Sequence, residues 1–133
     1  MTMHTLLLIA GVGQLALALA SLAIPRLLNW RDETQKLGPL TRAVFWTYAG
    51  YIWATNVAFG LLSVAAPTWL LDGTPLARAV SGFIALYWGA RVVIQLTAFG
   101  KYAPTGRGFR VAEMALVGLF VFLTVVYACV VFE

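Results

Sequence analysis

The stretch FRVAEMALVGLFVFLTVVYACVVF, residues 109 to 132, decides the fold of this 133-residue chain. Its two charged residues, Arg110 and Glu113, lie near its beginning, and most of the remainder is apolar. At 1.5 Å per residue, a helix of this length crosses a hydrocarbon core about 30 Å thick. Three further stretches, residues 5–28, 43–66 and 75–99, have the same character. The sequence therefore predicts four transmembrane helices.

The bulk composition points to the same environment. Hydrophobic residues make up 62% of the chain and the mean hydropathy is +0.87. A soluble domain of this size has too little interior to bury so much apolar surface. We predict an all-α fold, an integral membrane four-helix bundle with short loops, as a single domain over residues 1–133.

Positive charges are distributed unevenly among the predicted loops. Loop 25–43 contains Arg26, Arg31, Lys36 and Arg42, and loop 99–110 contains Lys101, Arg107 and Arg110. In a chain that crosses four times these two loops share one side, whereas the other side has only Arg78. Basic loops favour the cytoplasmic side. We therefore expect both loops to be cytoplasmic and both termini periplasmic, in a bacterial inner membrane.

The same charges bear on partners. A net charge of +4 could suit nucleic acid, but basic loops beside membrane spans are accounted for by topology. Their attraction to anionic lipid headgroups needs no further partner. We expect membrane lipids as partners, together with other membrane subunits or a second copy of the chain, and no nucleic acid.

Local signals predict how the helices begin and end. A short interfacial helix is expected over residues 29–37, with Asn29 as its cap and Lys36 paired to Asp32. Gly38 and Pro39 should end it. The third span should begin at Pro75, capped by Thr74.

Helical periodicity sorts each span into faces. Polar or small residues recur on one side of each predicted helix: Gly11, Gln14, Ala18 and Ser21; Tyr48, Tyr51 and Thr55 with Asn56 beside them; Ser81, Trp88, Arg91 and Gln95; Glu113, Phe120, Thr124 and Tyr127. Polar groups are costly against lipid, so we expect these faces to turn toward one another. Gly50, Ala54 and Ala58, spaced by four, would allow close helix contact.

Arg91 is the most informative single residue. An arginine deep in a span costs roughly 2.5–3.5 kcal/mol and needs a counterpart. Glu113 is the one acidic residue within a predicted span, and Gln95 lies one turn from Arg91 on the same face. One interpretation is that Arg91 and Glu113 form a buried, hydrogen-bonded ion pair that fixes how spans three and four pack. Another is that Arg91 reaches cytoplasmic water or a lipid phosphate. A third possibility is that Arg91 anchors an anionic ligand, with Glu113 as a titrating partner.

Aromatic residues are dense in spans two and three. The set comprises Trp46, Tyr48, Tyr51, Trp53, Tyr87 and Trp88. One interpretation is bundle packing, with the polar tips bonded to Gln14, Asn56 or backbone carbonyls. The other is an aromatic-lined pocket for a flat apolar molecule such as a quinone, a sterol-like lipid or a pigment.

Absent residue types exclude several chemistries. His4 is the only histidine, so bis-histidine haem ligation and a histidine-rich metal centre cannot form within one chain. Cys129 is the only cysteine, and no Ser–His pair or glycine-rich phosphate loop is present. We predict no metal, no cofactor and no catalytic residues.

These observations favour a small non-catalytic membrane protein. It would be a subunit of a larger membrane complex, or a module that binds a lipid, quinone or pigment within its helix bundle. One alternative is a homo-oligomeric transporter or channel that uses Arg91, Gln95 and Glu113. Another is a lipid-modifying membrane enzyme with Glu113 as acid or base. The candidate binding residues are Arg91, Glu113, Gln95, Trp88, Tyr87, Tyr51, Tyr48, Gln14 and Asn56.

Overall fold

A computed structural model describes residues 2–99, 101 and 106–133, and every regular element in them is helical. The order is α1 (Met3–Ser21), α2 (Ile24–Leu27), α3 (Trp30–Thr34), α4 (Pro39–Ala65), α5 (Pro67–Leu70), α6 (Pro75–Ile94), the π-helical turn η1 (Gln95–Phe99) and α8 (Arg107–Val131). The predicted all-α class is confirmed for these residues.

Three stretches are long and apolar enough to cross a membrane: Met3–Leu27, Pro75–Phe99 and Arg107–Val131, each of 25 residues. Helix α4 is longer, at 27 residues, but it is less apolar because it contains Asn56 and several tyrosine and threonine side chains. Three of the four predicted spans therefore have the composition of a transmembrane helix. The crossing of α4 stays a prediction.

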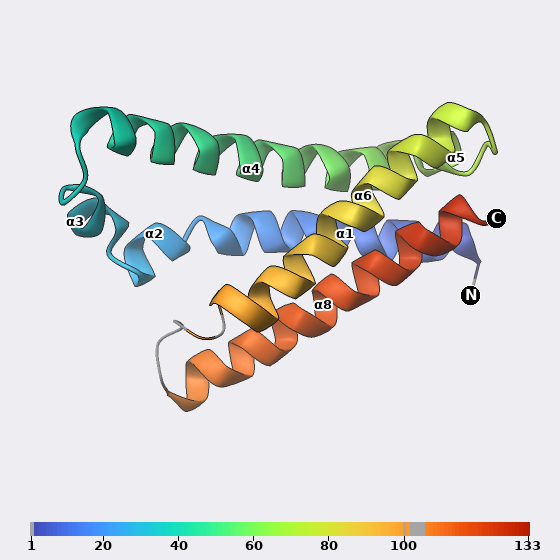
Figure 1. The fold of residues 1–133 in the computed structure, drawn as a ribbon. Helices are drawn as coiled ribbons and strands as arrows, with labels where there is room; N and C mark the ends of the chain where they lie inside the picture. Colours follow the sequence, from blue (N-terminus) through green and yellow to red (C-terminus); the bar gives the residue numbers. More distant parts are fainter. Residues whose placement is uncertain (1, 100, 102–105) are drawn as a thin grey trace.

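The long helices form two antiparallel pairs, α1 with α4 and α6 with α8 (Figure 1). Both chain termini and α5 lie at one end, which we call the terminal end. The other end contains α2, α3, the end of α6 and the beginning of α8, and we call it the basic end because Arg26, Arg31, Lys36, Arg42, Arg107 and Arg110 lie in or beside these elements. Figure 1 shows the two pairs close together at the terminal end and diverging toward the basic end.

The buried residues lie mainly where the two helix pairs are close together. The core comprises Leu7, Ala10, Leu70, Ile84, Trp88, Phe120, Leu123, Val126, Tyr127 and Val130. Among the described residues of α4 none before Gly60 is buried, and in α8 none before Phe120 is buried. The packed core therefore occupies the terminal half of the bundle, and the basic half contributes little to it.

Glycines bring α1 and α4 together. A Cβ at Gly11 would lie 2.9 Å from the carbonyl oxygen of Gly60, and a Cβ at Gly60 would lie 2.8 Å from Leu15 Cγ. Only glycine fits such a contact without displacing the neighbouring helix. The prediction of close contact at Gly50 is wrong, because a Cβ there would meet no described atom within 4 Å. Gly50 lies in the basic half, where the helices are less closely packed.

Proline sets several helix boundaries. Helix α1 ends at Ser21, four residues before Pro25, where the proline ring would clash with the preceding turn. Pro75 begins α6 as predicted, and the Thr74 side chain accepts a hydrogen bond of 3.1 Å from the Ala77 N–H. Pro39 was expected only to end the short helix, but it begins α4, four residues before the predicted start of span two.

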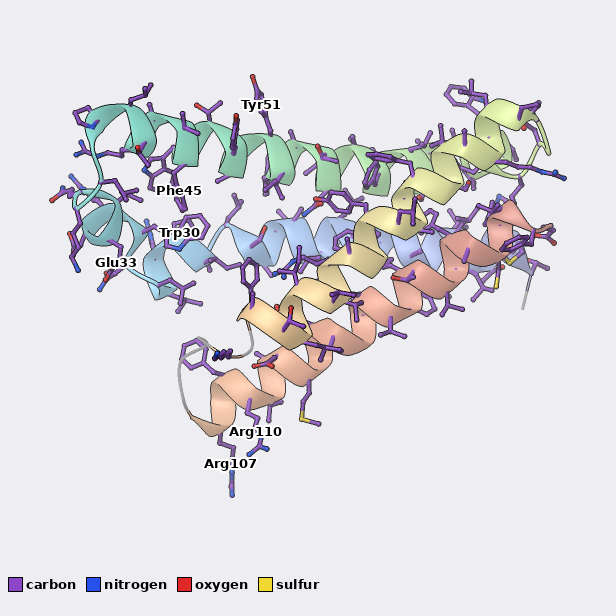
Figure 2. All side chains as sticks on the ribbon, in the orientation of Figure 1. Trp30, Glu33, Phe45, Tyr51, Arg107 and Arg110 are labelled. Carbon is purple, nitrogen blue, oxygen red and sulfur yellow. The ribbon has the colours of Figure 1, made fainter. Side chains whose placement is uncertain are left out.

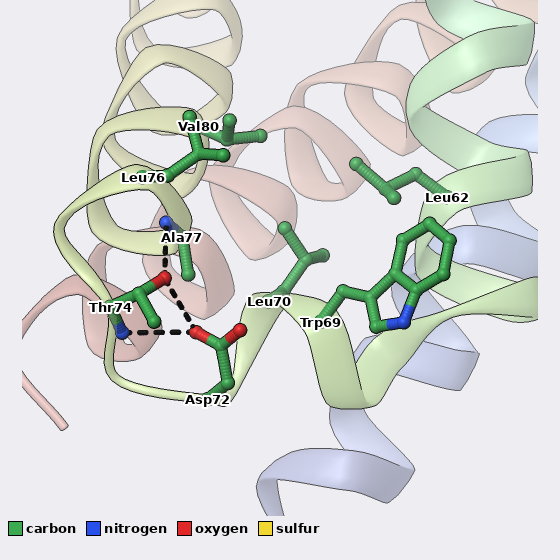
Figure 3. A pocket seen from close by; sticks show the side chains of 8 residues that line it. All are labelled: Leu62, Trp69, Leu70, Asp72, Thr74, Leu76, Ala77 and Val80. Carbon is green, nitrogen blue, oxygen red and sulfur yellow. Dashed lines mark hydrogen bonds between the residues drawn. The ribbon is translucent and has the colours of Figure 1, made fainter.

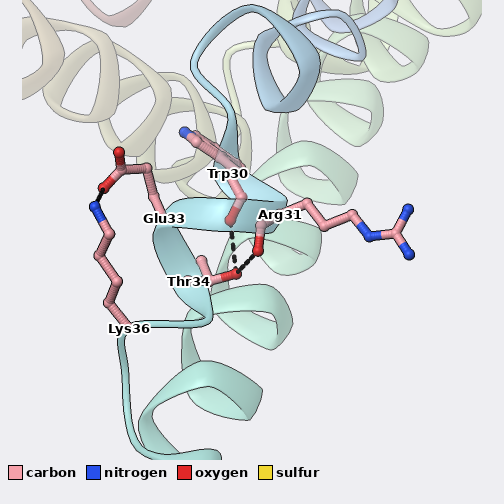
Figure 4. A network of polar contacts seen from close by, with 5 residues as sticks. All are labelled: Trp30, Arg31, Glu33, Thr34 and Lys36. Atoms are coloured by element: carbon pink, nitrogen blue, oxygen red, sulfur yellow. Dashed lines mark hydrogen bonds and ion pairs between the residues drawn. The ribbon is translucent and has the colours of Figure 1, made fainter.

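The interfacial helix is shorter than expected and is held differently (Figure 4). Asn29 has a left-handed backbone (φ 55°), and its side chain makes no capping bond to a described residue. Lys36 pairs with Glu33 at 3.4 Å instead of with Asp32. The predicted cap and pair are wrong because the helix ends at Thr34, which puts Lys36 outside the regular turn that i,i+4 pairing requires.

A glycine substitution tests the α1–α4 contact. We expect Gly60→Ala to destabilise the protein by about 1–3 kcal/mol, because the added methyl group overlaps Leu15. Gly50→Ala in the same helix is the matched control and should be neutral or slightly stabilising. Thermal unfolding in detergent measures both. Equal losses of stability would contradict the proposed contact.

Candidate functional site

Four buried polar side chains meet in the core, one from each long helix. They are Gln14 of α1, Ser63 of α4, Trp88 of α6 and Tyr127 of α8, and each has at most 2% of its surface exposed. Trp88 Nε1 donates to Gln14 Oε1 at 3.0 Å. Gln14 Nε2 donates to the Tyr127 hydroxyl oxygen at 2.6 Å, and the Tyr127 and Ser63 hydroxyls are hydrogen-bonded to each other.

Each donor in this polar cluster has an acceptor. The second Gln14 N–H donates to the Ala10 carbonyl at 3.3 Å, and the Ser63 hydroxyl donates to the Phe59 carbonyl at 2.9 Å. Tyr127 must then donate to Ser63, because the single hydroxyl hydrogen of Ser63 is already used. The cluster has no free N–H or O–H for a ligand. Its role is therefore structural: it ties the two helix pairs together.

Arg91 lies beyond this cluster, on the side of α6 toward the basic end. Its guanidinium carbon lies 4.5 Å from the centre of the Phe99 ring and 5.1 Å from that of Phe120. Such contacts stabilise a cation through the ring quadrupole. The side chain is half-buried, and its Nη1 is buried without a hydrogen-bond partner among the described residues.

The expected ion pair between Arg91 and Glu113 is not formed in the described structure, in which the ion pair present is Lys36–Glu33. Glu113 is half-buried on α8. It lies seven residues before Phe120, the ring that Arg91 contacts, so it is about 10 Å further along the helix toward the basic end. The sequence placed the two residues on facing helices but could not fix this difference in depth.

Gln95 is buried at the start of the π-helical turn η1, which directly follows α6. Its backbone N–H bonds to the carbonyl oxygens of Arg91 and Val92. Single π-helical turns are uncommon and frequently occur at functional sites. The sequence contained no signal for this turn, since no proline or glycine lies within it.

The remaining predicted residues separate into two groups. Tyr87 of α6 donates a hydrogen bond of 2.6 Å to Asn56 Oδ1 of α4, a direct contact between the two pairs. Tyr48 and Tyr51 are 61% and 67% exposed, and Figure 2 shows Tyr51 pointing away from α1. The expectation that they turn inward is wrong, because in the basic half α4 has a neighbour on one side only.

The other aromatic residues of α4 pack locally. Trp53 Nε1 donates to the Ala18 carbonyl of α1 at 2.9 Å. Phe45 contacts Trp30 of α3 edge to face, with ring centres 4.9 Å apart (Figure 2). Trp46 contacts the same Trp30 ring edge to face at 5.9 Å. These contacts fix α3 against the beginning of α4.

Two surface grooves lie outside the polar cluster. One, of about 310 Å³, is lined at the terminal end by residues that include Leu62, Trp69 and Asp72 (Figure 3). Hydrogen bonds from the backbone and side chain of Thr74 lower the pKa of Asp72, so this carboxylate is charged at neutral pH. The other, of about 340 Å³, lies between α1 and α4, and its lining is wholly apolar.

Among the described residues, no group of three or more His, Cys, Asp or Glu side chains could hold a metal ion. In comparisons with known proteins, no family model, no curated protein and no solved structure matches the chain.

Removing one hydroxyl tests the polar cluster. We expect Tyr127→Phe to cost about 1–2 kcal/mol of stability, because a buried Gln14 N–H and the Ser63 oxygen both lose their partner. Tyr51→Phe is the matched control and should be neutral, since that side chain is exposed. Thermal unfolding of the two variants measures the difference. An unchanged midpoint for Tyr127→Phe would mean that the cluster does not hold the helices.

Proposed function

We propose that this chain is a non-catalytic integral membrane protein that binds an apolar molecule, such as a lipid, quinone or pigment, between its two helix pairs. The observation that carries the proposal is the uneven burial: the pairs are packed together in the terminal half and separate in the basic half. A bundle whose only role was stability would gain from packing along its whole length.

A fourth crossing by α4 is part of this proposal. Helix α4 lies antiparallel to α1 and carries the chain from the basic end back to the terminal end, where α6 begins (Figure 1). If α1 and α6 both span the bilayer, α4 must cross the same thickness between them. Its lower hydropathy is then explained by polar residues that contact protein or a ligand, as Asn56 contacts Tyr87.

Aromatic rings surround the point where the pairs separate. Tyr87 packs edge to face on both Phe59 and Trp88, with ring centres 5.2 and 5.1 Å apart. Trp88 in turn stacks on Phe120 at 5.2 Å. The Tyr87–Asn56 hydrogen bond joins α6 to α4 at the inner end of the proposed site, and the half-buried Tyr87 and Phe59 rings would form its apolar wall.

A role as a subunit of a larger complex is the second candidate, and the outer face of α4 favours it. Tyr48 and Tyr51 place hydroxyl groups on an exposed face of a helix that is proposed to span the membrane. Such groups are more stable against another protein than against acyl chains. A partner helix covering this face would leave the space between the pairs free, so the two roles are compatible.

Gentle extraction tests the proposed binding. Protein purified in mild detergent should retain a stoichiometric apolar molecule, which mass spectrometry identifies. We expect Tyr87→Ala to reduce the retained amount about tenfold, because it opens the inner end of the site. Leu86→Ala is the control, since the neighbouring Leu86 is 75% exposed and lies outside the proposed site.

Thermal unfolding separates loss of binding from loss of fold in Tyr87→Ala. Wild-type protein without a retained molecule, or a Tyr87→Ala variant that is folded and fully loaded, would contradict the binding role. A polypeptide that co-purifies and is lost on Tyr51→Ala, with no bound small molecule, would favour the subunit role instead.

A further inference from the structure

Among the described residues, Arg91 is a cation without a counter-charge. Five acidic residues are present in the sequence. Glu33 pairs with Lys36, Asp72 accepts hydrogen bonds from Thr74, and Asp32 and Glu133 lie outside the long helices. Glu113 is the one acid within a long helix, and it forms no ion pair in the described structure. Whatever neutralises Arg91 must therefore come from outside the described chain.

Arg91 also makes no hydrogen bond to the part of the chain that the structure describes. A guanidinium has five N–H donors in a planar fork, and none of them bonds to a described residue. The Phe99 and Phe120 rings attract its charge but accept no conventional hydrogen bond from it. Leaving a charged donor unpaired in a desolvated place is costly, and the usual resolution is an anion or an ordered water.

The direction of the side chain suits a ligand that enters from the basic end. Phe99 lies eight residues after Arg91, so its Cα is about 12 Å further along the helix toward that end. Because the guanidinium lies over the Phe99 ring as well as near Phe120, the side chain extends from α6 toward the basic end. Trp88, one turn before Arg91, stacks on Phe120, so the residues next to Arg91 on the terminal side are apolar rings.

We propose that the ligand between the helix pairs is an amphiphile whose carboxylate or phosphate head binds the Arg91 guanidinium while its apolar tail lies along the separated helices. This inference rests on the proposed binding function and specifies the chemistry of its ligand. The guanidinium fork binds both kinds of oxyanion with two parallel hydrogen bonds. The π-helical turn keeps Gln95 one turn further on, where its side-chain amide makes no hydrogen bond to a described residue and can donate to the same head.

The test compares ligands that share a tail and differ in the head. Delipidated protein is titrated in detergent with oleate, with dioleoyl phosphatidylglycerol and with uncharged monoolein, and native mass spectrometry measures the bound fraction. Wild-type protein should bind at least one of the two anionic probes about tenfold more tightly than monoolein. Preferential binding of oleate alone would identify a fatty acid as the ligand. Preferential binding of phosphatidylglycerol alone would identify a membrane phospholipid. Preferential binding of both would show that the site accepts either a carboxylate or a phosphate.

Variants assign the preference to Arg91. Arg91→Gln should reduce binding of the anionic probe to the level of monoolein, and Arg91→Lys should be intermediate because it keeps the charge and loses the fork. Arg78→Gln, at the exposed beginning of the same helix, should change nothing. A folded Arg91→Gln protein that still prefers the anion would overturn this inference and leave the apolar site intact. A wild-type protein that binds none of the three probes would overturn the proposed function itself.

Discussion

Hydrogen bonding among polar side chains buried in an apolar core is the constraint on which the rest of the structure depends. A buried polar group has no water beside it, so a donor left without an acceptor is costly. Gln14, Ser63, Trp88 and Tyr127 meet this requirement across four helices in one continuous network. Because a slip of any helix would break at least one of these bonds, the network fixes how the two pairs face each other.

The position of this network also explains where the molecule is open. It lies in the terminal half together with the buried core, and the close contact between Gly11 and Gly60 is in the same half. In the basic half, α4 has no buried residue before Gly60 and α8 none before Phe120, and Arg91 has no acidic partner among the described residues. Close packing at one end and sparse burial at the other are the observations that support the proposed ligand binding between the helix pairs.

The sequence predicted helix content and inward faces well where the core is packed. The faces containing Gln14, Ser81 and Trp88 are buried, since period and polarity decide burial when a neighbouring helix is present on that side. The same reasoning failed for Tyr48 and Tyr51, because periodicity identifies a face but not whether another helix covers it. A sequence also does not reveal the relative height of two residues on neighbouring antiparallel helices. The sequence therefore predicts an Arg91–Glu113 pair, whereas in the structure Arg91 contacts Phe99 and Phe120. The π-helical turn and the Gly11–Gly60 contact depend on neighbours that one sequence does not reveal.

Distances between the two helix pairs in a lipid bilayer test the central claim most directly. Spin labels at exposed positions 40 and 114 report on the basic end, and labels at positions 61 and 125 report on the terminal half, each in a Cys129→Ala background. Pulsed electron paramagnetic resonance in nanodiscs should give a clearly longer distance for the first pair than for the second. Equal distances would mean that the bundle is packed along its whole length, which would contradict a binding space between the helix pairs.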